Sequence, residues 1–338
     1  MKKARFYEKN PDGSTLTCRL CHHNCRITTG KRGICMVREN IDGELYSMVY
    51  GRLVSASADP VEKKPLFHFM PGTKTFSIST TGCNFRCLHC QNYHISQYPL
   101  LHHGETGGQY IEPETVVRNA LNTGCRSISY TYVEPTIFYE YAFDTGVLAK
   151  EAGLKNIFVS NGYMQPGVTR ELATFLDGIN IDLKAFTDSF YRKTCGASLQ
   201  PILDNIRLFH ELGVWVEVTT LVIPGLNDSP GELRETARFI CGIDRKIPWH
   251  VTGFHPVYKM SDRQPTDSAT LKMARDIGME EGLDFVYAGN RPGSKGENTL
   301  CPGCGYEVIT RYGFSIVDYR LKNGKCPECG ERIDGLWG

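Results

Sequence analysis

The chain has 338 residues, of which 41% are hydrophobic and 22% charged, and its formal net charge at pH 7 is +1. These values are typical of a globular protein and give no basic footprint of the kind that binds nucleic acid. The sequence has no run of roughly 18 apolar residues for a membrane span and no apolar signal peptide at its start, so we expect a cytoplasmic protein without membrane or nucleic-acid partners.

Residues 1–60 form a predicted cysteine-rich module with little periodicity. Fourteen cysteines in a chain from a reducing compartment indicate metal sites rather than disulfides. This module holds a C-x2-C-x3-C run with one more cysteine downstream, and His22 or His23 is an alternative ligand. We favour structural zinc here, with an auxiliary [4Fe–4S] cluster as the alternative, because either accepts four thiolates. The four cysteines are Cys18, Cys21, Cys25 and Cys35.

The most informative motif follows a strand predicted at Thr75–Thr80. It is the C-x3-C-x2-C run made by Cys83, Cys87 and Cys90. Three thiolates hold three irons of a [4Fe–4S] cluster and leave the fourth iron without a protein ligand, whereas electron-transfer clusters take four cysteines. A metal site with an open position is typical of catalysis, because that position binds substrate. The motif therefore predicts a catalytic cluster; three unrelated thiols or part of a zinc site are the alternatives.

From about residue 73 to residue 290, strand patterns alternate with helical patterns. A helix is predicted at 112–121, helical spacing runs from Leu199 to Phe209, and Ser229-Pro-Gly-Glu232 is a capping-box start. Such alternation implies βαβ units and a parallel sheet, either an incomplete barrel or a doubly wound sheet. The cysteine loop must face a shared cavity, which favours the barrel. The predicted strands after the first are 127–132, 156–160, 179–183, 214–218, 250–254 and 284–287.

Polar side chains recur where these strands end. In a βα barrel the working face lies at the carboxyl ends of the strands, so we expect these side chains to share one cavity. A core strand does not normally carry a charged residue unless it is paired. The residues in question are Glu134, Ser160, Asn161, Asp182, Lys184, Glu217, Thr219, Thr220 and His255.

Residues 293–338 form a predicted zinc-ribbon-like module. Two Cys-Pro-x-Cys-Gly knuckles bracket a β-rich insert, and four thiolates at this spacing are typical of tetrahedral zinc. Its predicted role is to stabilise, through metal binding, a segment too short to fold alone. Nucleic-acid binding is the alternative, which the nearly neutral net charge disfavours. The ligands are Cys301, Cys304, Cys326 and Cys329. The scattered cysteines, predicted as small buried hydrophobes, are Cys125, Cys195 and Cys241.

The stretch Gly82–Asn92 resembles the pyruvate formate-lyase activating enzymes of the radical S-adenosylmethionine (SAM) superfamily. More narrowly, the chain resembles the radical SAM component of the AmmeMemoRadiSam system in its N-terminal cysteines, its Leu66–Gly72 lead-in and its Cys-x2-Cys tail. The resemblance covers nearly the whole chain. It implies an α/β fold with a partial (β/α)6 barrel over residues 61–292, SAM bound at the open iron and release of a 5′-deoxyadenosyl radical. It also implies a reductant such as flavodoxin or ferredoxin and a protein or peptide substrate.

The resemblance also assigns roles to single residues. Glu134 matches the acidic residue that holds the SAM amino group, with Tyr132 and Val133 in place of two glycines. Asp182-Leu-Lys184 matches a motif whose lysine approaches the SAM carboxylate. Ser160-Asn161-Gly162 matches a Thr-Asn-Gly run, with Val159 where the family has a cation-linked Asp. The residues expected near the adenosine are His89 and His255.

Each of these matches has a structural alternative. Glu134 could start a helix, where a carboxylate is favourable. Asp182 and Lys184 could form a structural ion pair, and His255 could belong to a turn. At the level of the whole chain, the alternatives to a radical enzyme are a non-catalytic iron–sulfur protein and a zinc-ribbon nucleic-acid module.

Overall fold

The central element of the computed structural model, which describes residues 1–11, 13–289 and 295–337, is an eight-stranded sheet. Its order is β16-β15-β14-β13-β12-β11-β9-β8, and all neighbours are parallel except β8, which is antiparallel to β9. Its strands are β8 (Ser55–Pro60), β9 (Lys74–Ser79), β11 (Ser127–Tyr130), β12 (Lys155–Ser160), β13 (Gly178–Asp182), β14 (Trp215–Val222), β15 (Trp249–Gly253) and β16 (Val286–Gly289).

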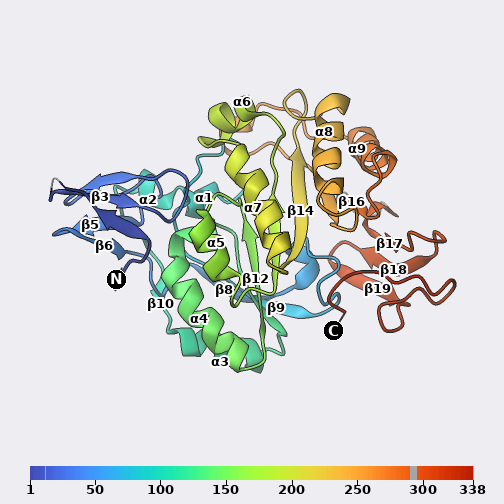
Figure 1. The fold of residues 1–338 in the computed structure, drawn as a ribbon, viewed down its shortest axis with the longest axis horizontal. Helices are drawn as coiled ribbons and strands as arrows, with labels where there is room; N and C mark the ends of the chain where they lie inside the picture. The colour runs from blue at the N-terminus through green and yellow to red at the C-terminus, as the bar shows by residue number, and fades with distance from the viewer. Residues whose placement is uncertain (12, 290–294, 338) are drawn as a thin grey trace.

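The two outer strands, β8 and β16, are the edges of this sheet, so the barrel is open. Helices follow the parallel strands and cover the outside, as Figure 1 shows for α4, α5 and α7. The predicted α/β partial barrel is thus confirmed, and β16, which corresponds to the strand predicted at 284–287, is a parallel strand beyond the six that the resemblance implies. The helices are α3 (Pro113–Asn122), α4 (Tyr139–Glu151), α5 (Pro166–Leu172), α7 (Gln200–Glu211), α8 (Pro230–Cys241) and α9 (Ser268–Glu280).

Local chemistry explains why these elements form where they do. The Ser229 side chain accepts a hydrogen bond from the Glu232 backbone N–H at 3.3 Å, and Pro230 occupies the first position of α8. Proline is favourable there because its missing N–H has no partner in the first turn. In α7 the apolar residues Ile202 and Ile206 are fully buried. All four residues of β11 are buried, as expected for a parallel strand covered on both faces.

Short helical segments complete the barrel region. Two of them flank the cysteine loop and one follows Glu134, so they bear directly on the site. They are α1 (Tyr93–Ser96), α2 (Tyr98–Leu101), α6 (Asp188–Phe190), the π-helix η3 (Tyr191–Cys195), and the 3₁₀ helices η1 (Val61–Lys63), η2 (Pro135–Phe138), η4 (Tyr258–Met260) and η5 (Lys295–Glu297).

The N-terminal module is built from short antiparallel strands in two three-stranded sheets, β1-β6-β5 and β2-β3-β4. The last strand of the predicted module, β8, belongs to the main sheet instead, where it pairs with β9. The module's strands are β1 (Lys2–Lys3), β2 (Tyr7–Lys9), β3 (Thr15–Cys18), β4 (Arg26–Thr28), β5 (Arg38–Ile41), β6 (Glu44–Ser47) and β7 (Arg52–Leu53), the last paired with β10 (Gln109–Tyr110).

The C-terminal module lies at the opposite end of the long axis from the N-terminal module (Figure 1). It is an antiparallel sheet of β17 (Thr299–Leu300), β18 (Glu307–Tyr312) and β19 (Ser315–Tyr319). Its core joins Val308 and Ile309 to Phe285 and Tyr287 of the barrel. Its predicted start at residue 293 lies outside the described residues.

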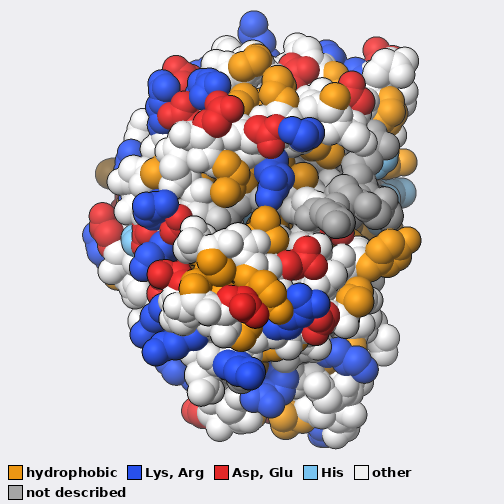
Figure 2. All heavy atoms as spheres, turned by 90° about the vertical axis from the view of Figure 1, so that its right-hand side faces the viewer, with side chains coloured by type: hydrophobic (Ala, Val, Ile, Leu, Met, Phe, Trp, Pro, Cys, Tyr) orange, Lys and Arg blue, Asp and Glu red, His pale blue; other side chains and the backbone are white. Residues whose placement is uncertain are grey.

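The surface of this end carries both signs of charge. Figure 2 shows Lys and Arg side chains interspersed with Asp and Glu side chains over this face. None of the helices that the structure describes combines the length and apolar character that a membrane crossing requires.

Candidate active site

The loop that carries the three central cysteines is clamped between two short helices. The Gly82 N–H donates to the Ile95 carbonyl in α1 at 3.0 Å. On the other side, the Arg86 N–H donates to the Cys195 carbonyl at 2.8 Å, at the end of η3. A loop held on both sides presents its side chains in a fixed orientation toward the carboxyl ends of the strands.

Cys83, Cys87 and Cys90 line one pocket of about 450 Å³. This volume falls in the range of small-molecule sites, about 300–1,000 Å³. The Phe85 N–H points at the Cys83 sulfur at 3.4 Å, and the Ser96 hydroxyl lies 3.2 Å from the Cys90 sulfur. Burial raises the pKa of the Cys83 and Cys90 thiols, so these side chains need a metal to become thiolates at neutral pH. This donor set fits a [4Fe–4S] cluster with one iron left open to the pocket.

A fourth cysteine lies against this set. Cys195 is fully buried, and its sulfur is within 4.8 Å of ligand atoms of Cys87 and His89. Cys195 and Cys125 are buried as predicted, whereas Cys241 is only half-buried. No sequence pattern indicates the Cys195 contact, because this contact depends on how the π-helix η3 packs on the cysteine loop.

Glu134 follows β11, lines the pocket and is buried. Its Oε1 accepts hydrogen bonds from the Thr136 N–H at 3.1 Å, from the Thr136 hydroxyl at 2.5 Å and from the Ser160 hydroxyl at 2.8 Å. Its Oε2 accepts one, from the Asn161 N–H at 2.7 Å. Burial raises the pKa of this carboxyl, and the four donors oppose that shift. Glu134 therefore caps η2 and also keeps Oε2 with acceptor capacity toward the pocket.

Tyr132 adopts a left-handed backbone conformation with φ +67°. Glycine takes this conformation without steric cost, whereas a tyrosine needs support from its surroundings. In this chain the tyrosine is held by a buried ion pair. Its hydroxyl donates to Asp59 at 2.5 Å, and the Lys64 ammonium lies 3.0 Å from the same carboxylate oxygen. Burial lowers the pKa of Lys64 to about 8.

Asp182 and Lys184 meet at the end of β13, where both line the pocket. The Lys184 ammonium donates to Asp182 Oδ2 at 2.8 Å. Burial alone would lower the pKa of Lys184, but the charge of the Asp182 carboxylate beside it raises the pKa overall. Lys184 is therefore positively charged at neutral pH, beside the cysteine loop.

Ser160, Asn161 and His89 also line the pocket. The Asn161 side-chain amide donates to Asn84 Oδ1 at 2.8 Å, which ties the end of β12 to the cysteine loop. His89 is buried, and burial lowers its pKa to about 3. Its Nδ1 has no hydrogen-bond partner among the described residues. A neutral ring with a free nitrogen at the pocket wall fits a contact with a heterocyclic ligand.

Some of the residues predicted for the site lie outside the pocket. His255 is exposed and is not part of the pocket lining. Thr219 lines the pocket as expected, whereas Glu217 on the same strand is not part of the lining. The Glu217 carboxylate accepts hydrogen bonds from the Phe67 and His68 N–H groups at 2.9 and 2.8 Å, so it is a structural anchor. Thr220 also lies outside, where it accepts from the Trp249 indole at 2.9 Å.

The pocket includes residues that no strand pattern had singled out. Phe314, at the β18–β19 turn of the C-terminal module, forms part of its wall, as do Lys63 and Asn92. Phe314 is 48% exposed. A large exposed aromatic residue next to Gly313 in a tight turn is a weak sequence signal for a ligand contact. Only the fold brings this turn to the strand ends.

The four C-terminal cysteines converge as a zinc site requires. Their sulfur atoms all lie within 4.8 Å of one another. The Cys301–Cys329 and Cys304–Cys326 sulfur pairs are separated by 3.5 and 3.7 Å. Zinc–sulfur bonds of about 2.3 Å in a tetrahedron place the sulfurs about 3.8 Å apart. These thiols fit a single ion of this kind.

Comparisons with known sequences show relatives of the chain. The profile of the radical SAM superfamily matches residues 77–240. An uncharacterized protein of Methanocaldococcus jannaschii is 45% identical over 337 residues, which cover 99% of both chains. The pyruvate formate-lyase-activating enzyme of Clostridium pasteurianum is 23% identical over 219 residues, which cover 60% of this chain and 88% of that enzyme.

Solved structures share the fold. A radical SAM methyltransferase from Sphaerobacter thermophilus has a TM-score of 0.51 and 15% identity, with 85% of this chain and 76% of that chain covered. SuiB of Streptococcus suis, solved with bound S-adenosylmethionine, has a TM-score of 0.51 and 13% identity, with 68% of this chain and 53% of that chain covered.

Proposed function

The chain belongs to the radical SAM superfamily, and we propose that it cleaves SAM reductively at a [4Fe–4S] cluster held by Cys83, Cys87 and Cys90. When bound, this cluster and SAM supply the 5′-deoxyadenosyl radical, which abstracts hydrogen from a substrate. The protein contributes binding, orientation and exclusion of water.

One observation carries this proposal. The three thiols share a single pocket with an acidic and a basic anchor, Glu134 and Lys184, which come from two different strand ends. SAM carries an amino group and a carboxylate, so a carboxylate acceptor and an ammonium donor complement it at opposite points. Charge-assisted hydrogen bonds of this kind are short and strong in a buried site.

The residues around these anchors have supporting roles. Asp182 keeps Lys184 charged and fixes its ammonium group at 2.8 Å. Ser160 and Asn161 orient the Glu134 carboxylate by donating to both of its oxygens. His89 provides a neutral aromatic surface at the pocket wall for the adenine ring.

The substrate class we propose is a protein or peptide. The Clostridium pasteurianum relative is named as an activating enzyme of another protein, pyruvate formate-lyase. The sheet is open at β8 and β16, and a wall of the pocket comes from the hairpin turn at Phe314 instead of from a further barrel strand. A segment of a macromolecule reaches a pocket bounded in this way more readily than it reaches the interior of a closed barrel.

The reaction is tested by incubating the anaerobically reconstituted protein with SAM and dithionite. We expect slow formation of 5′-deoxyadenosine and methionine even without the true substrate, detected by chromatography. The variant with Cys83, Cys87 and Cys90 replaced by alanine should form none, and Cys241→Ala is the matched control that should keep the activity. A SAM-bound, fully reconstituted protein that makes no 5′-deoxyadenosine would contradict the proposal and favour a non-catalytic iron–sulfur protein.

A further inference from the structure

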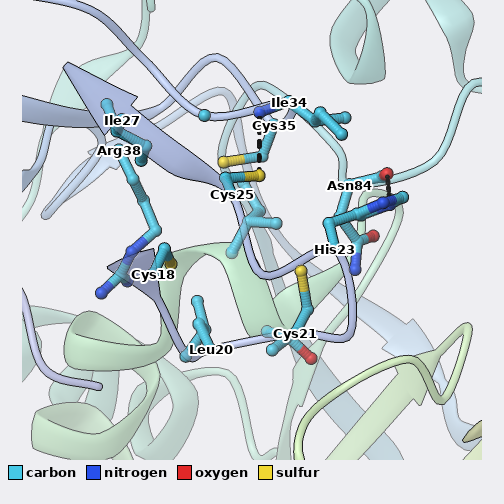
Figure 3. Close-up of a pocket in the computed structure, with 13 residues that line it drawn as sticks. Cys18, Leu20, Cys21, His23, Cys25, Ile27, Ile34, Cys35, Arg38 and Asn84 are labelled. Carbon is cyan, nitrogen blue, oxygen red and sulfur yellow. Dashed lines mark hydrogen bonds between the residues drawn. The ribbon is translucent and has the colours of Figure 1, made fainter. Parts of the chain in front are cut away.

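The four cysteines of the N-terminal module surround one hollow. Cys18, Cys21, Cys25 and Cys35 line it together with apolar side chains such as Leu20 and Ile27. Figure 3 shows these cysteines coming from different parts of the module and facing a common space. We propose that they bind a second [4Fe–4S] cluster, which serves as an electron-transfer centre.

The histidines near this site are not needed to complete its ligand set. The His23 Nε2 lies 2.7 Å from the Asn84 carbonyl oxygen, the contact drawn as a dashed line in Figure 3. A carbonyl only accepts, so this nitrogen carries hydrogen and is not free to bind metal. His22 packs against the Tyr163 ring. The four thiols are enough by themselves to saturate a cluster and leave no open iron.

The spacing of the sulfur atoms separates this site from the zinc-like one. Among the described residues, the groups of three or more ligand atoms within 4.8 Å are the C-terminal four cysteines and the group of Cys87, His89 and Cys195. No three of the four N-terminal thiols lie this close to one another, and neither do the three catalytic thiols. A cluster binds each thiolate through a different iron, so its ligands stand wider apart than those of one zinc ion.

Two buried donors point to an anionic group in the hollow. The Arg38 side chain is 1% exposed and lines the hollow, and its Nε has no hydrogen-bond partner among the described residues. The Asn84 Nδ2, also at the hollow, is equally buried and equally without a partner. Buried N–H groups without partners are costly. Sulfur atoms of an anionic cluster would accept from both.

The hollow measures about 10 Å³, so the thiol side chains occupy the centre of the site. A cluster enters only when these side chains turn outward, which needs rotation about single bonds. Cys25 borders Ile34, which is 43% exposed, so this corner of the site has room for the movement.

The site lies directly behind the catalytic cysteine loop. A Cβ atom on Gly82 would lie 2.9 Å from the Cys35 carbonyl oxygen, so only glycine fits between the two segments. A hydrogen-bonded route also joins the two sites. The Cys25 sulfur accepts from the Ile34 N–H at 3.4 Å, the Ile34 carbonyl accepts from the Arg86 guanidinium, and this guanidinium donates to the Cys83 carbonyl at 2.8 Å.

This route gives the second cluster its role. One electron from a low-potential one-electron donor, such as reduced flavodoxin or ferredoxin, reduces the second cluster. The same electron then passes on to the catalytic cluster, and the second cluster returns to its oxidised state. The electron route depends on the proposed function, whereas the identity of the metal does not.

The test is a metal count on the full-length protein with Cys83, Cys87 and Cys90 replaced by alanine. After anaerobic reconstitution we expect about four irons per chain to remain, against about eight in the unaltered protein, since each cluster holds four. Dithionite should produce a paramagnetic signal from the remaining cluster that does not respond to SAM. This variant makes no 5′-deoxyadenosine in any case, so its metal content is independent of the proposed reaction.

Two further variants sharpen the result. Adding Cys18→Ala and Cys35→Ala should remove the remaining iron, while adding Cys241→Ala should leave it in place. If the first of these variants fails to fold, the difference in iron content between the unaltered protein and the triple variant still tests the proposal. Zinc without iron in the triple variant, or four irons in the unaltered protein, would overturn the proposal.

Discussion

Lys184 is the residue through which the proposed SAM site is most directly tested. Its ammonium group is paired with Asp182, so its presence in the pocket has two explanations, a ligand contact or a structural ion pair. Glu134 is a poorer probe, because it also caps η2 and accepts four hydrogen bonds from its neighbours. Replacing Glu134 would alter the fold of the pocket wall together with the binding of SAM.

We expect Lys184→Ala to weaken SAM binding while the iron content stays unchanged. The lost charge-assisted contact should cost about 1.5–3 kcal/mol of binding free energy. Equilibrium binding to the anaerobically reconstituted protein measures this, with Lys272→Ala as the control because that lysine is 76% exposed on α9. An unchanged SAM affinity in Lys184→Ala would assign the residue to a structural ion pair.

At the scale of single elements, the strands of the barrel were predictable because their apolar runs are short and separated by clear helix signals. The predicted strand at 179–183 corresponds to β13 (Gly178–Asp182), and the capping box at Ser229 does begin α8. The strand β8 was not predicted, since its sequence Ser-Ala-Ser-Ala-Asp-Pro lacks large apolar residues. It is formed by pairing with β9, a contact that no local pattern encodes.

The residues of the candidate active site that lie at the ends of strands could be predicted from the sequence. Glu134, Asp182 and Lys184 share the pocket because each lies at the carboxyl end of a parallel strand or just after it. Glu217 differs because it lies two residues earlier on its strand than Thr219, on the same face but deeper in the barrel. Contacts made by other elements, such as Phe314, depend on tertiary packing and leave only a weak signal in the local sequence.

The C-terminal module is held by its metal ligands and a small apolar core. We expect one zinc ion per chain bound by the four C-terminal cysteines, Cys301, Cys304, Cys326 and Cys329. Chelation should unfold this module before the barrel, because metal binding supplies much of the folding energy of such small units. Limited proteolysis after chelator treatment should show early cleavage within 299–337, and Cys241→Ser is the control that should retain zinc. Iron at these four cysteines would contradict this prediction.

At the scale of the whole molecule, a buried polar network joins the barrel to the C-terminal module. His68, in the lead-in segment at 66–72, contacts the Asp334 carbonyl through Nδ1 at 2.8 Å and the Tyr287 hydroxyl through Nε2 at 2.6 Å. The carbonyl only accepts, so Nδ1 carries the hydrogen and Nε2 accepts from the tyrosine. This arrangement needs a neutral ring.

The network therefore predicts a loss of stability in acid. Burial lowers the pKa of His68 from 6.5 to about 4. Above pH 6.5 the ring is neutral in both states, whereas between pH 6.5 and 4 the unfolded chain binds a proton that the folded chain does not. The free energy of unfolding should fall through this window by up to about 3 kcal/mol.

Urea unfolding under anaerobic conditions at pH 7.5 and pH 5 would measure this loss in the unaltered protein and in His68→Gln. Acid also weakens metal binding, because thiolates take up protons, but this affects both proteins alike. At pH 7.5 the unaltered protein should be the more stable, since glutamine does not reproduce both ring contacts. At pH 5 the difference should shrink, because glutamine does not titrate.

The exposed His102→Gln variant is the control, and its stability should follow that of the unaltered protein at both pH values. A gap between His68→Gln and the unaltered protein that is the same at both pH values would mean that the pKa of His68 is equal in the folded and unfolded states. His68 would then be protonated in the folded protein at pH 5, and the neutral network would be wrong.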